Sequence, residues 1–290
     1  MSSQMPWLRF HAYVVGLPKT GSTSLAGLMG EYRAGHETWL DFLATAGVAR
    51  ARGEIDDAAF WATVKRRFVP LRAEMDAVTC HHLYADVLME QYPKASFIVT
   101  YRDVRSWVNS MLSMCTSVRR MPTDYQERRR GWIDSYGDWA GEGTIPFRFG
   151  RDDIDTVALP ALMRTWATYM RHMPTVLPAE STLWLKTSEI TARTPELAEF
   201  LKIPVDSLVM DAVHSNRTVA TFDRFVIADR DEVDRVYAEH CAELMAEHFP
   251  DEHARILNRT VNSDPSGWDD YLRRVDAELV GWDNQEGRPQ

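Results

Sequence analysis

The residues with the clearest chemical potential lie in one short stretch near the start of the chain, residues 16–24, which read GLPKTGSTS. Gly16 and Gly21 have the spacing of the glycines in the NTP-binding pattern G-x-x-x-x-G-K-[ST]. That pattern requires a lysine after the second glycine, but Ser22 stands there and the lysine is Lys19, inside the loop. The stretch is therefore either an altered NTP-binding loop or a phosphate loop for a different ligand.

The segments on either side of this loop favour phosphate binding. Residues 12–17 are apolar and predict a buried strand, and residues 22–30 can form the helix that follows. In a strand–loop–helix unit of this kind, backbone N–H groups of the loop and of the helix N-terminus face an anion. We therefore expect the loop to hold a phosphate group, and an ordinary glycine-rich turn is the structural alternative.

A magnesium site of the kind found in NTP-using enzymes is weak or missing in the sequence. Such enzymes place a carboxylate for the metal at the end of a neighbouring strand. The nearest match is Asp103, which follows the predicted strand at residues 96–101 but has the position of an N-cap for the next helix. We therefore expect no metal to be required.

Two motifs, in this order, resemble those of the sulfotransferases that use 3′-phosphoadenosine 5′-phosphosulfate (PAPS). The first is PKTGST after a strand, and the second is a strand that ends at Tyr101-Arg102-Asp103 and is followed by Ser110. In that family the P-K-x-G-[ST]-[ST] loop holds the 5′-phosphosulfate, and an arginine at a later strand end, with a serine eight residues on, holds the 3′-phosphate. The resemblance covers about residues 10–112 well and the remainder loosely.

The resemblance implies a donor site and a catalytic cation. The expected donor-binding residues lie in the loop, at the second strand end and in a late basic loop: Lys19, Thr20, Gly21, Ser22, Thr23, Ser24, Arg102, Ser110 and Arg217. Lys19 is also expected to stabilise the bridging oxygen as it leaves, and loss of such a group typically costs ~10² or more in rate. The donor would leave as adenosine 3′,5′-bisphosphate.

Two places compete for the base that takes the proton of the acceptor. At His36-Glu37, the resemblance to sulfotransferases of polysaccharides implies that Glu37 is the base. At His81-His82, the resemblance to cytosolic sulfotransferases of small molecules implies a histidine. Histidine and a buried glutamate can both be tuned to neutral pH. Glu37 and His82 rank equally, followed by His36 and then His81, and Asp76 could orient a histidine.

The elements that must position these residues alternate between strands and helices along the chain. The predicted strands are the apolar or β-branched runs at residues 12–17, 73–79, 96–101 and 182–186. This order predicts a three-layer α/β fold, with a mainly parallel central sheet, helices on both faces, a P-loop-like phosphosulfate loop and helical insertions. In such sheets ligands bind at the carboxyl ends of the strands.

We expect one sulfotransferase domain over residues 1–290. Its middle, residues 113–157, is rich in Arg, Gly, Asp and aromatic residues and lacks sustained periodicity. That composition is typical of a lid or substrate-facing insertion. Aromatic side chains such as Trp39, Trp132 and Trp139 could then form walls of an acceptor pocket.

Charge and composition limit the possible partners and location. The net charge of −9 argues against a nucleic-acid partner. The three cysteines show neither a zinc spacing nor a disulfide framework, and the chain has no pattern of a signal peptide or membrane span. We therefore expect a cytoplasmic enzyme that sulfonates a hydroxyl, or an amine, of a small-molecule or natural-product acceptor in secondary metabolism.

Two other functions remain open at this point. A P-loop kinase of a small molecule would share the strand, loop and helix, but it would need Mg-ATP. A non-catalytic nucleotide-binding protein would bind PAPS without turnover, and loss of Lys19 would then weaken binding only.

Overall fold

The computed structural model describes residues 8–117, 123–147, 156–211, 222–226, 228–257, 267–268 and 270–274. The chain divides into two compact units. The first comprises Met1–Arg102, Asp138–Gly143 and Thr168–Asn216, and the second comprises Asp103–Gly137, Thr144–Ala167 and Arg217–Gln290. The prediction of a single domain over the whole chain stays a prediction.

The first unit is built on a five-stranded sheet with the order β2-β3-β1-β4-β5. Its strands are β1 Ala12–Gly16, β2 Ala34–His36, β3 Met75–Ala77, β4 Ser96–Tyr101 and β5 Thr182–Lys186. Each of the four strand pairs is parallel, which confirms the predicted α/β fold with a parallel sheet. The sequence analysis did not predict β2, because its three residues, Ala-Gly-His, contain no apolar run.

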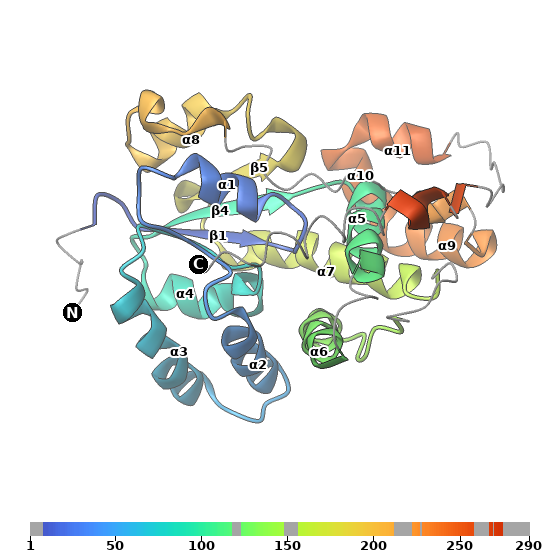
Figure 1. Cartoon of the computed structure of the whole chain (residues 1–290), viewed down its shortest axis with the longest axis horizontal. Coiled ribbons are helices and arrows are strands. Elements are labelled where there is room, and N and C mark those ends of the chain that lie inside the picture. The colour runs from blue at the N-terminus through green and yellow to red at the C-terminus, as the bar shows by residue number, and fades with distance from the viewer. Residues whose placement is uncertain are drawn as a thin grey trace. The chain divides into compact units, whose positions relative to one another are not determined.

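Helices lie on both faces of this sheet (Figure 1). One face carries α1 Ser22–Leu28 and α8 Thr194–Leu201, and the other carries α2 Leu40–Ala51, α3 Asp57–Leu71 and α4 Ala85–Gln91. Alternate residues of β1 supply the two cores: Val14 joins Leu25 and Leu197 on the first face, and the Tyr13 ring contacts that of Phe68 on the second. Burial on both faces explains why β1 is apolar throughout.

The register of the sheet brings the carboxyl ends of its strands to one edge. Gly16 pairs with Thr100, His36 with Ala77, and Tyr101 with Lys186. The residues that follow these strands therefore meet at the same edge of the sheet. They are the predicted phosphate loop after β1, Glu37 after β2, Thr79 after β3, Arg102 after β4 and Thr187 after β5.

The second unit is helical in the part that the structure describes. It contains α5 Val104–Ser117, most of α6 Thr123–Ala140, the first half of α7 Leu159–Val176, α9 Arg230–Val236, α10 Ala242–His248 and α11 Pro250–Leu257. A π-helical turn, Tyr237–Cys241, joins α9 to α10. No helix in the described ranges is long and apolar enough to cross a membrane.

A buried arginine organises the second unit. Arg224 has no exposed surface, and its guanidinium donates to the hydroxyls of Ser113 and Thr116 on α5 and of Tyr271. Its backbone N–H donates to Asn109 Oδ1 at 3.0 Å. Because of these bonds, Arg224 joins α5 to two later segments of the unit. The guanidinium also lies over the rings of Trp268 and Tyr271.

The region predicted as a lid is residues 113–157. Its described part consists mainly of the end of α5, the helix α6 and the turn after α6. A lid role for it stays a prediction. All three cysteines, Cys80, Cys115 and Cys241, are free and buried.

Candidate functional site

The loop between β1 and α1 holds two residues in the left-handed conformation. Lys19 has φ 66° and Gly21 has φ 108°. A non-glycine residue adopts such a φ only where its surroundings enforce it, and residues of this kind cluster at functional sites. Gly21 is required twice over, because a Cβ there would lie 2.5 Å from Ile190 Cδ1. The loop containing the predicted catalytic lysine is thus held in a strained shape.

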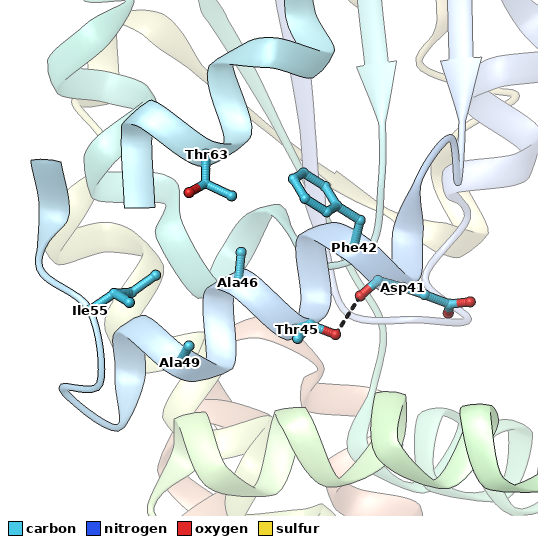
Figure 2. Close-up of a pocket in the computed structure, with 7 residues that line it drawn as sticks. All are labelled: Asp41, Phe42, Thr45, Ala46, Ala49, Ile55 and Thr63. Carbon is cyan, nitrogen blue, oxygen red and sulfur yellow. Dashed lines mark hydrogen bonds between the residues drawn. The ribbon is translucent and has the colours of Figure 1, made fainter. Parts of the chain in front are cut away.

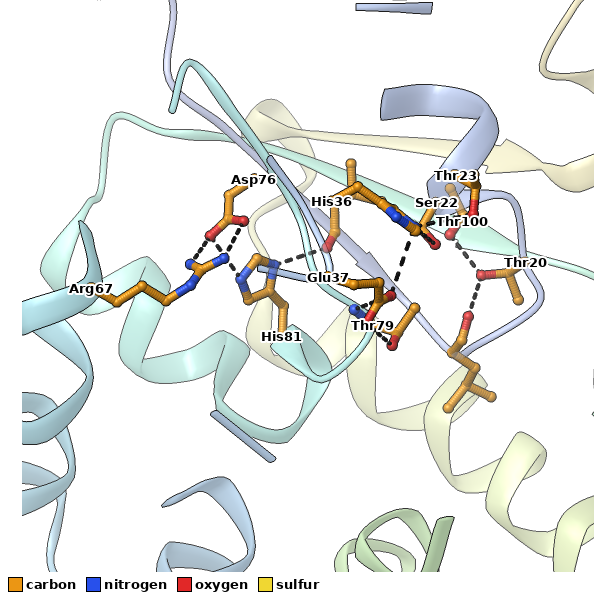
Figure 3. Close-up of polar contacts among 12 residues, drawn as sticks. Thr20, Ser22, Thr23, His36, Glu37, Arg67, Asp76, Thr79, His81 and Thr100 are labelled. Atoms are coloured by element: carbon orange, nitrogen blue, oxygen red, sulfur yellow. Dashed lines mark hydrogen bonds and ion pairs between the residues drawn. The ribbon is translucent and has the colours of Figure 1, made fainter. Parts of the chain in front are cut away.

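Hydroxyl groups inside the protein hold that shape (Figure 3). Thr20 Oγ1 donates to the Leu17 carbonyl at 2.6 Å and lies 2.8 Å from Thr100 Oγ1 on β4. Only 1% of the Thr20 surface is exposed, so its hydroxyl braces the loop. Gly16 has no room for a side chain, since a Cβ would lie 2.1 Å from Thr100 Oγ1.

His36, at the end of β2, lies beside the start of α1. Its Nε2 is 3.1 Å from Thr23 Oγ1 and 3.4 Å from Ser22 Oγ, so one histidine meets two of the hydroxyls that the sequence analysis placed in the donor site. The same nitrogen is 3.8 Å from Glu37 Oε1. Burial lowers the pKa of His36, so the imidazole is neutral at pH 7.

Glu37 follows directly and also has a left-handed backbone, with φ 53°. Its carboxylate accepts hydrogen bonds from Thr79 at the end of β3, from the backbone N–H at 3.4 Å and from Oγ1 at 3.3 Å. Its own N–H donates to the Ala77 carbonyl at 3.2 Å. About a quarter of its side chain, 26%, is exposed. The carboxylate is therefore oriented and still reachable, as a general base requires.

A buried ion pair fixes the chain on either side of Glu37. The guanidinium of Arg67, on α3, donates through both terminal nitrogens to the Asp76 carboxylate on β3. Its Nε donates to the Thr38 carbonyl at 2.8 Å, directly after Glu37. Burial would raise the pKa of Asp76, but its interactions with His81 and Arg67 outweigh that effect and hold it at about 2. Asp76 is therefore ionised at neutral pH.

His81 is a core residue in this arrangement. Its Nδ1–H donates to the Val14 carbonyl at 3.0 Å, and its Nε2 lies 3.3 Å from Asp76 Oδ2. The histidine that Asp76 orients is thus His81, and the side chain of His81 has no exposed surface.

His82 is also completely buried. Its Nδ1–H donates to the Thr79 carbonyl at 2.8 Å, and its ring packs edge-on against Trp139 and Tyr169. Burial lowers the pKa of His82 to about 3, so the ring is neutral at physiological pH. Of the two equally ranked candidates for the base, the geometry favours Glu37, because Glu37 is exposed beside the loop and His82 is enclosed.

The residues predicted to bind a second phosphate fall in different parts of the chain. Arg102 is half-buried and follows β4 in the first unit, and Ser110 is buried on α5 in the second. Asp103 Oδ1 accepts from the N–H of Ser106 at 2.8 Å, which confirms its prediction as the cap of α5. Arg217 lies outside the described residues.

An apolar pocket of about 400 Å³ lies between α2 and α3, a few residues beyond Glu37 (Figure 2). Its lining includes Phe42, Ala46, Ala49 and Ile55. Trp39 and Phe42 are exposed and in edge-to-face contact, with 5.9 Å between their ring centres. Of the tryptophans named as possible acceptor walls, Trp39 is thus on the surface, and Trp132 is buried.

The sequence analysis missed three residues that shape the site: Arg67, Thr79 and Thr100. Two of them are threonines at the carboxyl end of a strand or just after it, and a hydroxyl at that position was a usable signal. Arg67 gave no such signal, because a lone arginine on an amphipathic helix is normally solvated.

A family profile described as "Sulfotransferase domain" matches residues 13–210 of this chain. The chain therefore belongs to the sulfotransferase domain family and is a transferase. No curated protein matches it. A solved structure described as "Sulfotransferase Domain from the Curacin Biosynthetic Pathway" is 12% identical, with a TM-score of 0.39 over 94% of this chain and 98% of that one. A likeness this distant says nothing about donor or acceptor.

Proposed function

We propose that this protein transfers a sulfonate group from PAPS to a hydroxyl, or an amine, of a small-molecule acceptor. Membership of the sulfotransferase family supports the reaction type. One observation carries the proposal furthest: Glu37, His36 and the hydroxyls of Ser22 and Thr23 form one cluster at the end of the loop that contains Lys19. A candidate base and candidate anion-binding hydroxyls therefore lie close together in the first unit, beside the start of the helix that follows the loop.

In the proposed reaction the acceptor oxygen forms a bond to the sulfur while the bond from sulfur to the bridging oxygen of PAPS breaks. The acceptor proton goes to the Glu37 carboxylate, and the electron pair of the broken bond stays on the bridging oxygen. Lys19 stabilises that charge, and the product is adenosine 3′,5′-bisphosphate. Such catalysis depends on positioning and charge neutralisation, as phosphoryl transfer does.

The neighbours of Glu37 suit this role. Two hydrogen bonds from Thr79 orient the carboxylate, and burial lowers the pKa of the neighbouring His36. Natural products are the acceptor class we favour, and a cytoplasmic location is part of the same proposal.

Ligand-dependent thermal unfolding tests the choice of donor. A ligand that binds only the native state at 100 times its Kd stabilises a protein by about 2.7 kcal/mol. We expect adenosine 3′,5′-bisphosphate to raise the Tm by several degrees and ATP with magnesium to do little. The reverse ranking would support a kinase instead.

Turnover then separates an enzyme from a binding protein. We expect Lys19→Ala to lower the rate of sulfonate transfer by about 10² or more, with a smaller effect on nucleotide affinity. If the wild-type protein binds the bisphosphate but transfers no sulfonate to any of a panel of phenols, alcohols and amines, a non-catalytic role replaces the proposal.

A further inference from the structure

We propose that Thr187 is a positioning residue whose single hydroxyl orients the phosphate loop and the end of β4 together. The inference rests on the proposed function, in which the loop holds the 5′-phosphosulfate and Arg102 holds the 3′-phosphate. Thr187 would then couple the two anion sites of the donor.

The hydrogen bonds of Thr187 carry this proposal. Thr187 is the first residue after β5 and opens the 3₁₀-helical turn η4, Thr187–Glu189. Its Oγ1 lies 2.7 Å from the Thr20 carbonyl and 3.1 Å from the Tyr101 carbonyl. A hydroxyl has one proton, so it is shared between these two acceptors. All three residues belong to the first unit.

Because the peptide group is planar, these two hydrogen bonds also set the direction of two backbone N–H groups. In a trans peptide the carbonyl and the following N–H lie in one plane and point in opposite directions. A Thr20 carbonyl held by Thr187 therefore makes the Gly21 N–H point away from Thr187. In the same way, the bond to Tyr101 sets the direction of the Arg102 N–H. These are the amides of the two residues expected to meet the 5′- and 3′-phosphates.

The loop needs such a restraint because its backbone is strained at Lys19. The turn after β5 supplies a second contact: Ile190 Cδ1 occupies the space beside Gly21 that a side chain would fill. Residues 187–190 therefore support the loop from one side. The Thr187 hydroxyl binds backbone carbonyls, so its role in donor binding is to position the backbone of the protein.

Matched variants test the role of the hydroxyl. Thr187→Val keeps the shape of the side chain and removes the donor, and Thr187→Ser keeps the donor. Thr182→Val is the control, because Thr182 Oγ1 also donates to a carbonyl, that of Pro178 at 2.7 Å, at the opposite end of β5. Calorimetry would measure the Kd of each protein for adenosine 3′,5′-bisphosphate, adenosine 5′-phosphate and adenosine 3′-phosphate.

We expect Thr187→Val to weaken binding of all three nucleotides, by about tenfold for the bisphosphate, because two partly buried carbonyls lose their donor. Thr187→Ser and Thr182→Val should stay within about twofold of the wild type. A loss confined to one mononucleotide would overturn the coupling, and unchanged binding by Thr187→Val would overturn the positioning role.

Hydrogen exchange of the free proteins separates this inference from the proposed function. In Thr187→Val, amides in residues 17–24 and 101–104 should exchange faster than in Thr182→Val. If the wild type binds none of the nucleotides, the proposed function fails, and the exchange data still decide whether Thr187 holds both segments. Unchanged exchange in either segment would overturn the inference.

Discussion

At the scale of single residues, the site depends on which polar side chains the fold leaves accessible. Glu37 and His82 both contact Thr79, one through the carboxylate and the other through the ring nitrogen Nδ1. Glu37 stays partly exposed, and His82 is enclosed by aromatic rings. The two residues that ranked equally as candidates for the base thus differ in whether a substrate could reach them.

Replacing each of these two residues separately tests the assignment of the base. We expect Glu37→Gln to lower kcat for sulfonate transfer by 10²–10⁴, the usual contribution of a general base, with little change in Tm. His82→Ala should chiefly lower the Tm, because it empties a buried aromatic site. The measurement is kcat at saturating PAPS beside thermal unfolding. Near-normal turnover of Glu37→Gln together with a large loss of kcat in His82→Ala would assign the base to His82.

At the scale of elements, one ion pair joins α3, β3 and the turn after β2. Arg67 bonds to Asp76 on β3 and to the Thr38 carbonyl, and both charged side chains are almost fully buried. The pair keeps the end of β2 aligned with its neighbour, and so it supports the left-handed turn at Glu37. Breaking it should cost more than breaking a surface pair, because a charge is left buried without compensation.

We expect Asp76→Asn to lower the free energy of unfolding at pH 7 by about 3–5 kcal/mol. Asp57→Asn is the matched control, since it breaks an exposed pair with Arg50 and should cost less than about 1 kcal/mol. Urea unfolding of the two variants and the wild type measures both costs. A similar cost for the two substitutions would show that burial of the Asp76 pair adds nothing.

The same pair makes a prediction about pH. The pKa of Asp76 is depressed to about 2 in the folded protein, from 3.8. Its stabilising effect is therefore complete above pH 4 and is lost as the pH falls from about 4 through 2. The difference between the wild type and Asp76→Asn should shrink by about 2 kcal/mol over that window. A difference that stays constant from pH 5 to pH 2 would contradict the assigned ionisation.

At the scale of the whole molecule, the two compact units have separate cores. The second is organised around Arg224, whose bonds all go to residues of that unit. We expect Arg224→Met to lower the stability of the second unit by about 1.5–3 kcal/mol, because the hydroxyls of Ser113 and Thr116 lose a charged hydrogen-bond donor. Native-state hydrogen exchange should then speed up in α5 and leave β1 and α1 less affected. Equal acceleration in both units would show that they unfold as one.

The sheet was predictable from sequence wherever a strand is buried on both faces. The runs that became β1 and β4 are apolar or β-branched, and burial requires that composition. β5 is an edge strand in which only alternate residues are buried. β2 could not be found in this way, because it is a half-buried edge strand of three residues. Apolar residues recur at helical spacing over residues 232–248, and the π-helical turn at Tyr237–Cys241 leaves this pattern almost unchanged, so the turn could not be found from the sequence.

The parts of the site that belong to a local sequence motif could be predicted. The loop follows from its glycines, Lys19 and hydroxyls, and Glu37 follows from the resemblance to a family. The supporting residues could not be found in the same way, because their partners are distant in sequence. Thr187 bonds to a carbonyl 167 residues away, and Glu37 meets Thr79 only through the register of β2 and β3.

The buried thiols can report how often each part of this protein unfolds locally. Burial raises the pKa of Cys80 far above its usual range, and Cys115 and Cys241 are likewise enclosed. A thiol in that state reacts only when the surrounding structure opens. Cys80 belongs to the first unit and the other two to the second, so the rates at which an alkylating reagent modifies each would time the opening of the two units separately.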